Sequence, residues 1–256
     1  YNRAGRGPRP LVVFPLLTFE NKPQFGMLSM YGFLREAYTL FAGQRRPGMP
    51  VGYTLGDMGN DYATMIREEF GGPVDVIGIS TGGSIALHFA ADHPDLVRNL
   101  VIHSSAHTLN EGAKALQLDV ARLAQIGRWR QAFSALIRTV FPQRGLGMWF
   151  AQPLVWLSAS LLSLKPPRDP GDLVATIEAE DKHAFKDRLH EIAAPTMVAG
   201  GAEDFFYSPT LFRETAAGIP GARLCLYEDV GHPAGGKRFR SDVLAYLREN
   251  GEGSGQ

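Results

Sequence analysis

The chain has 256 residues, of which 45% are hydrophobic, enough to build one large core and too many for an intrinsically disordered chain. Lysine plus arginine and aspartate plus glutamate both total 26, so no overall field favours nucleic acid or an anionic membrane surface, and a small-molecule partner is expected. The single cysteine, Cys225, excludes an internal disulfide and a cysteine-based zinc site.

The start of the sequence lacks the pattern of a secretory leader, so the cytoplasm is the default expectation, although Tyr1 leaves open what precedes it. Residues 147–164 contain no charged side chain, but Gln152, Pro153 and three serines favour a buried or lid helix pair over a membrane span. We therefore expect no membrane span. The oligomeric state stays open.

In chain order, six short apolar runs predict β-strands, and helical patterns separate most of them. Such alternation is typical of an α/β fold with a mostly parallel central sheet flanked by helices. The expected strands are residues 11–14, 51–54, 74–79, 100–103, 196–199 and 223–227. The expected helices around them are residues 27–41, 61–70 and 241–249.

One long interval breaks this rhythm, because it contains helical patterns and no convincing strand. We interpret it as an inserted all-helical cap, or lid, at residues 108–190, between the core segments 1–107 and 191–250; residues 251–256 are expected to form a flexible tail. The helices expected in the cap are residues 111–126, 129–141, 148–164 and 172–181.

A serine stands where the strand at 74–79 meets the next helical run, in the pentapeptide Gly78-Ile79-Ser80-Thr81-Gly82. Glycines two residues before and after the serine allow the tight turn that presents a nucleophile at the edge of a sheet. The pentapeptide alone is a weak signal, and the strand and helix around it give it weight. The pattern predicts that Ser80 is a nucleophile.

A serine hydroxyl needs a base, and the base needs a group that fixes its tautomer. Asp204 follows the strand at 196–199 and His232 follows the last strand, in the order acid then histidine that a serine on such a turn requires. We assign them as the orienting acid and the base. Glu203 is the competing carboxylate, and His103 is a weaker candidate for the base.

Acyl transfer also needs two backbone N–H groups directed at the developing oxyanion. Thr81, directly after the nucleophile, is expected to supply one. The other is expected from the loop after residues 11–14, where Leu16 and Leu17 are both candidates and Leu17 is preferred.

Taken together, these motifs resemble the α/β-hydrolase superfamily, in the branch with a helical cap after the sixth strand. The resemblance spans nearly the whole chain. It implies the triad Ser80, His232 and Asp204, with Thr81 and Leu17 as oxyanion donors. The chain departs from the family in having Pro15-Leu16 where His-Gly or Pro-Gly is usual, and in an amino-terminal strand pair that is short or absent. The matching segments are residues 78–83, 93–101, 189–196, 201–204 and 231–232.

Serine rather than aspartate at the turn predicts acyl-serine chemistry on an ester, lactone or thioester, with no cofactor and no metal. Two alternatives remain: hydrolysis of a carbon–carbon bond in a ring-fission product, and a small-molecule receptor that keeps the triad but turns over negligibly. Aromatic and methionine side chains are expected to line an apolar pocket beneath the cap. They are Trp129, Phe133, Met148, Trp149, Trp156 and Phe205.

Overall fold

The computed structural model describes residues 1–22, 25–139 and 147–251. Within them, one seven-stranded sheet has the order β1-β3-β2-β4-β5-β6-β7, parallel except for the antiparallel pair β1 and β3. The predicted α/β fold with a mostly parallel sheet is confirmed. The strands are β1 (Asn2–Gly5), β2 (Arg9–Phe14), β3 (Tyr38–Ala42), β4 (Val74–Ile79), β5 (Val97–His103), β6 (Thr196–Gly201) and β7 (Arg223–Tyr227).

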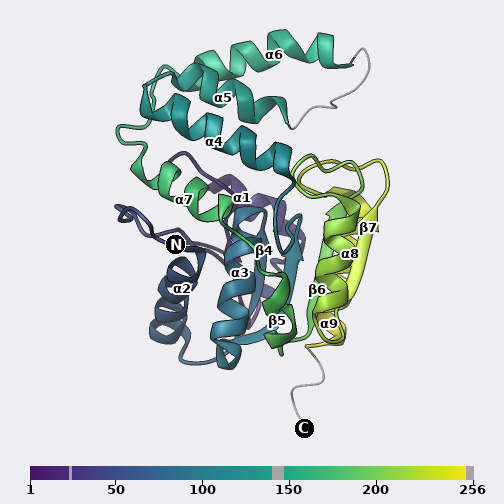
Figure 1. Cartoon of the computed structure of the whole chain (residues 1–256). Helices are drawn as coiled ribbons and strands as arrows, with labels where there is room; N and C mark the ends of the chain where they lie inside the picture. Colours follow the sequence, from purple (N-terminus) through teal and green to yellow (C-terminus); the bar gives the residue numbers. More distant parts are fainter. Residues whose placement is uncertain (23–24, 140–146, 252–256) are drawn as a thin grey trace.

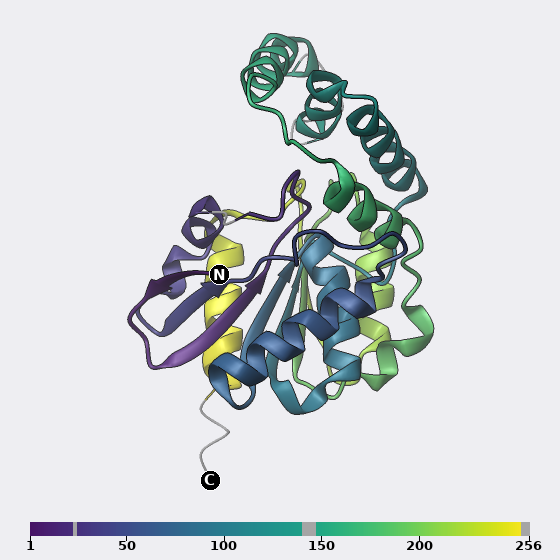
Figure 2. The same ribbon diagram turned by 90° about the vertical axis from the view of Figure 1, so that its left-hand side faces the viewer.

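Helices cover both faces of the sheet (Figures 1 and 2). Side chains of β2 alternate between the two hydrophobic layers: Val12 and Phe14 pack with α2, α3 and α8, whereas Leu11 and Val13 pack with α1 and α9. The helices are α1 (Phe25–Met30), α2 (Leu55–Phe70), α3 (Thr81–Asp92), α8 (Pro209–Gly218) and α9 (Gly236–Glu249), with short 3-10 turns η1 (Gly32–Leu34), η2 (Pro94–Leu96) and η3 (Lys186–Glu191).

Two predicted elements near the amino terminus are wrong. Residues 51–54 form a turn, and Val51 is 96% exposed. Thr54 is the N-cap of α2 and makes a reciprocal pair of hydrogen bonds with Asp57, so the helix begins directly after this turn. Residues 27–41 do not form one helix: α1 ends at Met30, and β3 begins at Tyr38. The five residues of β3 are all buried between β1 and β2, and such a continuous apolar run cannot be told from a buried helix by its pattern.

Four helices lie between β5 and β6, and among the described residues of this interval there is no strand. They are α4 (Glu111–Gln125), α5 (Trp129–Arg138), α6 (Gly147–Leu162) and α7 (Gly171–Asp181). In Figure 1, α4, α5 and α6 form a stack above the sheet, and α7 lies between that stack and the core. The resemblance places a helical cap after the sixth strand. Here the helices follow the fifth strand of the chain, because the amino-terminal pair of strands is reduced to the four-residue β1.

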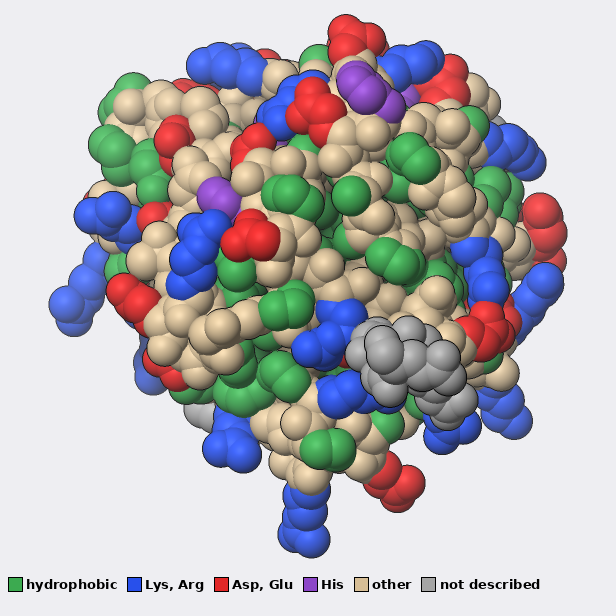
Figure 3. All heavy atoms as spheres, turned by 90° about the horizontal axis from the view of Figure 1, so that it is seen from below, with side chains coloured by type: hydrophobic (Ala, Val, Ile, Leu, Met, Phe, Trp, Pro, Cys, Tyr) green, Lys and Arg blue, Asp and Glu red, His purple; other side chains and the backbone are tan. Residues whose placement is uncertain are grey.

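The four inserted helices have a small core of their own, which includes Val120, Leu173 and Ile177. On the face of the molecule opposite them, acidic and basic side chains are interspersed (Figure 3). No helix of the part of the chain that the structure describes is long and apolar enough to cross a membrane.

Candidate active site

The turn between β4 and α3 is tightly built around Ser80. Ser80 has a φ of 52°, a positive value that is uncommon for a residue with a side chain. Its backbone N–H donates to the carbonyl of His103 at 2.9 Å, and its own carbonyl accepts from the N–H of Gly83 at 2.7 Å. These bonds fix the strained turn at the carboxyl edge of the sheet, so the hydroxyl is held in one place.

Gly82 is required by close packing, because a Cβ there would overlap the carbonyl oxygen of Phe14 and lie 2.7 Å from that of Pro15. We expect Gly82→Ala to lower the free energy of unfolding by about 3 kcal/mol or more, since backbone atoms cannot move aside as side chains do. Gly112→Ala is the matched control: it lies on α4 with nothing within 4 Å of the added Cβ, and should stabilise by roughly 0.5–1 kcal/mol. Urea unfolding measures both; equal effects would contradict the packing argument.

Ser80, His232 and Asp204 form a continuous hydrogen-bonded chain, as their order in the sequence predicts. His232 Nε2 lies 3.0 Å from Ser80 Oγ, and His232 Nδ1 lies 2.7 Å from Asp204 Oδ2. Because the carboxylate can only accept, Nδ1 carries the proton and Nε2 accepts from the serine hydroxyl. The serine and the aspartate are 6% and 7% exposed, so little water competes for these bonds.

Loops after β6 and β7 bring the acid and the histidine together. The N–H of Glu203 donates to the carbonyl of Val230 at 3.0 Å, which binds one loop to the other. Asp204 Oδ1 accepts from the backbone N–H groups of Phe206 at 2.8 Å and Tyr207 at 3.1 Å. Three hydrogen bonds therefore fix the orientation of the Asp204 carboxylate, and Oδ2 is left to face His232.

The alternative candidates for acid and base lie elsewhere. The side chain of Glu203 is exposed. His103 is fully buried and accepts at Nδ1 from the hydroxyl of Tyr31, while its Nε2 donates to the carbonyl of Ala234, both at 2.7 Å. Burial lowers the pKa of His103 to about 3. With both ring nitrogens bonded away from Ser80, His103 is a neutral structural side chain whose carbonyl supports the turn.

The loop after β2 carries Leu16 and Leu17, the two candidates for the second oxyanion donor. Arg45, 2% exposed, donates to the carbonyls of Pro15 and Leu16, each at 3.1 Å, and to Thr18 Oγ1 at 2.6 Å. The C=O and N–H of a planar trans peptide point in opposite directions, so the N–H groups of Leu16 and Leu17 point away from Arg45. Among the described residues, no group accepts a hydrogen bond from either N–H or from that of Thr81.

The aromatic side chains expected to line a pocket are divided between the insertion and the acid loop. Trp129 and Phe133 are buried in the core of the inserted helices, where Phe19 from the loop after β2 contacts both, with ring centroids 6.4 and 4.4 Å away. Trp156 is 58% exposed, with the guanidinium of Arg130 6.0 Å from its ring. The contacts of Phe19 with Trp129 and Phe133 join the insertion to the core, whereas Trp156 faces outward.

Phe205 is half-buried and packs edge-on against Phe206, whose ring centroid lies 4.7 Å from that of His232. Phe206 therefore provides an apolar contact beside the histidine. The side chains of Met148 and Trp149 lie outside the described residues.

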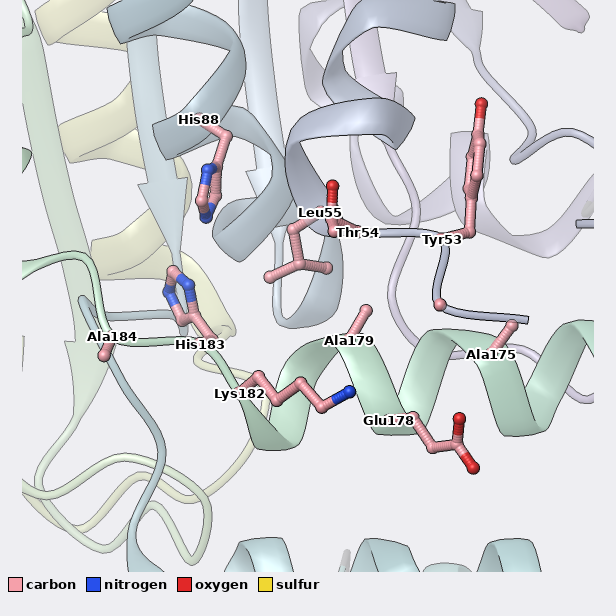
Figure 4. A pocket seen from close by; sticks show the side chains of 11 residues that line it. Tyr53, Thr54, Leu55, His88, Ala175, Glu178, Ala179, Lys182, His183 and Ala184 are labelled. Carbon is pink, nitrogen blue, oxygen red and sulfur yellow. The ribbon is translucent and has the colours of Figure 1, made fainter. Parts of the chain in front are cut away.

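A cavity of about 240 Å³ lies between α7, α3 and the start of α2, as Figure 4 shows. Tyr53, Leu55, His88, Lys182 and His183 are among its lining residues, and none of the three hydrogen-bonded residues is. The cavity is thus separate from the site around Ser80. Among the described residues, no group of three or more His, Cys, Asp or Glu side chains is arranged to hold a metal ion.

Two buried charged residues beside the site were not found from the sequence. Arg45 braces the loop after β2, and Glu180, on α7, accepts a hydrogen bond from the hydroxyl of Thr81 at 2.7 Å. Neither lies in a motif. Nothing in the sequence distinguishes them from exposed charged residues, and only the fold shows that they are buried.

Comparison with known proteins identifies relatives of this chain. A family model described as alpha/beta hydrolase fold matches residues 40–170. The chain is 27% identical over 192 residues to the putative non-heme bromoperoxidase BpoC of Mycobacterium tuberculosis, covering 71% of this chain and 69% of that protein. It is 25% identical over 176 residues to a pimeloyl-[acyl-carrier protein] methyl ester esterase of Neisseria meningitidis, covering 66% of each chain.

Solved structures share the fold over nearly the whole chain. The crystal structure of the same bromoperoxidase superposes with a TM-score of 0.78 at 22% identity, covering 97% of this chain and 95% of that one. The crystal structure of the enol-lactonase from Burkholderia xenovorans superposes with a TM-score of 0.78 at 19% identity, covering 96% and 95%. The order of strands and helices described above is therefore that of known alpha/beta hydrolase folds.

Proposed function

The chain belongs to the alpha/beta hydrolase fold family, and on that premise we propose that it is a serine hydrolase that cleaves an ester, lactone or thioester of a fairly apolar small molecule. The observation that carries the proposal is the hydrogen-bonded chain from Asp204 through His232 to Ser80, with the serine on a strained turn. A hydrolase is also consistent with relatives named as an esterase and an enol-lactonase.

In the proposed mechanism, Ser80 Oγ attacks the substrate carbonyl while His232 Nε2 takes its proton. Asp204 holds the imidazole in the required tautomer and stabilises the imidazolium that forms. The backbone N–H groups of Thr81 and Leu17 donate to the oxyanion, the first from the amino-terminal end of α3. His232 then gives its proton to the leaving oxygen or sulfur. In deacylation, His232 takes a proton from the water that attacks the acyl-serine, and returns it to Ser80 Oγ as the acid leaves.

The apolar preference rests on a ring beside the triad and on apolar side chains of the loop after β2. Phe206 packs against His232, and Leu17 and Phe19 pack against the core of the inserted helices. Within the proposed division, residues 1–107 and 191–250 form the hydrolase core and residues 108–190 form a cap, so the acyl or alcohol part of the substrate binds between the two.

Pre-steady-state mixing with a p-nitrophenyl ester tests the proposal. We expect a burst of about one nitrophenolate per chain, followed by slower turnover, because acylation releases nitrophenolate faster than deacylation frees the serine. Intact-mass measurement on the quenched reaction should show one acyl group, on the peptide that contains Ser80. Ser241→Ala, at an exposed serine of α9, is the matched control and should keep both signals.

A folded chain that gives neither burst nor adduct with a pooled set of esters, thioesters and lactones would overturn the proposal. If the same chain instead releases product from a dienoate, carbon–carbon bond hydrolysis is the activity. If it binds ligand with thermal stabilisation and forms no product, it is a receptor.

A further inference from the structure

A buried carboxylate joins the helical insertion to the turn that carries the nucleophile. Glu180, near the end of α7, is 0% exposed. Oε2 accepts from Thr81 Oγ1 at 2.7 Å and Gln117 Nε2 at 3.3 Å, and Oε1 accepts from Ser84 Oγ at 3.1 Å and Tyr207 Oη at 3.2 Å. Burial raises the pKa of Glu180, and these four donors act in the opposite direction. Four donors and no acceptor are the surroundings that suit an ionised carboxylate.

The four donors come from three parts of the structure, with Thr81 and Ser84 both on α3. Thr81 directly follows the nucleophile, and Tyr207 lies in the acid loop, where its backbone N–H donates to Asp204 at 3.1 Å. Gln117 comes from α4, inside the insertion. Glu180 therefore contacts the nucleophile turn and the acid loop at once, and does so from a helix outside the core. Its contact with Thr81 is the one closest to the reacting atoms.

Arg45 has an equivalent role at the loop after β2. It is 2% exposed, and its hydrogen bonds to the carbonyls of Pro15 and Leu16 direct the N–H of Leu17 away from it. Burial lowers the pKa of Arg45, while the carboxylates of Glu180 and Asp172 act in the opposite direction. Two buried side chains, one acidic and one basic, thus each brace one of the two segments that carry the proposed oxyanion donors, and Glu180 favours the charged form of Arg45.

We propose that Glu180 is a positioning residue of the oxyanion hole, which orients the backbone N–H of Thr81 through the Thr81 hydroxyl only while α7 is docked on the core. The inference rests on the proposed serine-hydrolase function. It adds that the inserted helices complete the catalytic geometry as well as covering the pocket. Movement of α7 away from the core breaks the bond to Thr81 and lowers the rate of acylation.

Substitutions at Thr81 separate positioning from anchoring. Thr81→Val removes the hydroxyl, keeps the shape of the side chain and leaves the backbone N–H in place, so we expect kcat for a nitrophenyl ester to fall about tenfold with KM within about twofold. Loss of a whole oxyanion donor has a larger effect, roughly 10²–10³-fold, and here the donor is displaced and not deleted. Thr81→Ser keeps the hydroxyl and should restore kcat to within about twofold of the wild-type value.

Ser84→Ala is the matched control. Ser84 is equally buried on α3 and donates to the same carboxylate, but one turn further from the nucleophile. It should lower thermal stability as much as Thr81→Val and leave kcat within about twofold.

Affinity for phenylboronic acid gives a second readout, which stability alone does not move. Ser80 Oγ adds to boron, the serine proton passes to His232 Nε2, and boron becomes a tetrahedral anion with an oxygen in the oxyanion hole. Thr81→Val should weaken this binding about tenfold, and Ser84→Ala should not.

Equal kcat and equal boronate affinity in Thr81→Val and Ser84→Ala, beside an active wild-type chain, would overturn the inference alone and leave Glu180 as a structural anchor. A wild-type chain that neither turns over esters nor binds the boronate would overturn the proposed function, and this inference with it.

Discussion

Replacing Ser80 with alanine is expected to lower kcat for a nitrophenyl ester by about 10⁶-fold, the loss typical of a nucleophile that acts as a unit with its base. The substitution removes the oxygen that lies 3.0 Å from His232 Nε2. It also removes the acceptor of the acyl group, so the burst and the mass adduct should both vanish.

The variant should fold, because alanine adds no atom to the crowded turn and only one hydrogen bond is lost. We expect the free energy of unfolding to change by less than about 1.5 kcal/mol. Thermal unfolding and retained binding of an uncleaved substrate analogue check this. Turnover above one tenth of the wild-type value in a folded Ser80→Ala chain would exclude Ser80 as the nucleophile, whatever the geometry around it.

The turn at Ser80 is the part of the site that the sequence predicts most directly, for a physical reason. Its requirements are local: a strand, a helix, and glycines at positions where a Cβ would overlap the neighbouring backbone, as at Gly82. Asp204 and His232 are remote in sequence, but each follows a parallel strand. Because the carboxyl ends of parallel strands meet at one edge, the order of the elements is enough to bring all three together.

What the sequence does not predict depends on contacts between distant elements. β3 is an apolar run that becomes a strand because it fills the place between β1 and β2. Glu180 lies in a helix with other acidic residues, and nothing in the pattern distinguishes the buried carboxylate from that of its half-buried neighbour Glu178. Arg45 stands in a loop where an exposed side chain is the ordinary expectation. Only the assembled fold shows that both charges are enclosed.

Asp204→Asn is expected to lower the rate of acylation at neutral pH by about 10⁴-fold, although it removes a single charge and barely changes the shape of the side chain. The N–H groups of Phe206 and Tyr207 both point at one oxygen of this side chain. In the variant, that place must be taken by the amide oxygen, because the amide nitrogen would oppose two donors. The amide NH₂ is therefore turned toward His232.

An NH₂ group facing His232 reverses the tautomer of the ring. It donates to Nδ1, which must then be unprotonated, so Nε2 carries the proton and donates to Ser80 Oγ instead of accepting from it. Stopped-flow measurement of the burst gives the rate, and ¹⁵N NMR of the imidazole reports which nitrogen is protonated. Glu203→Gln, at the adjacent exposed carboxylate, is the control and should keep the wild-type rate within about twofold. A fast Asp204→Asn chain, or one whose Nδ1 remains protonated, would contradict this argument, since the backbone donors of the acid loop leave the amide no other orientation.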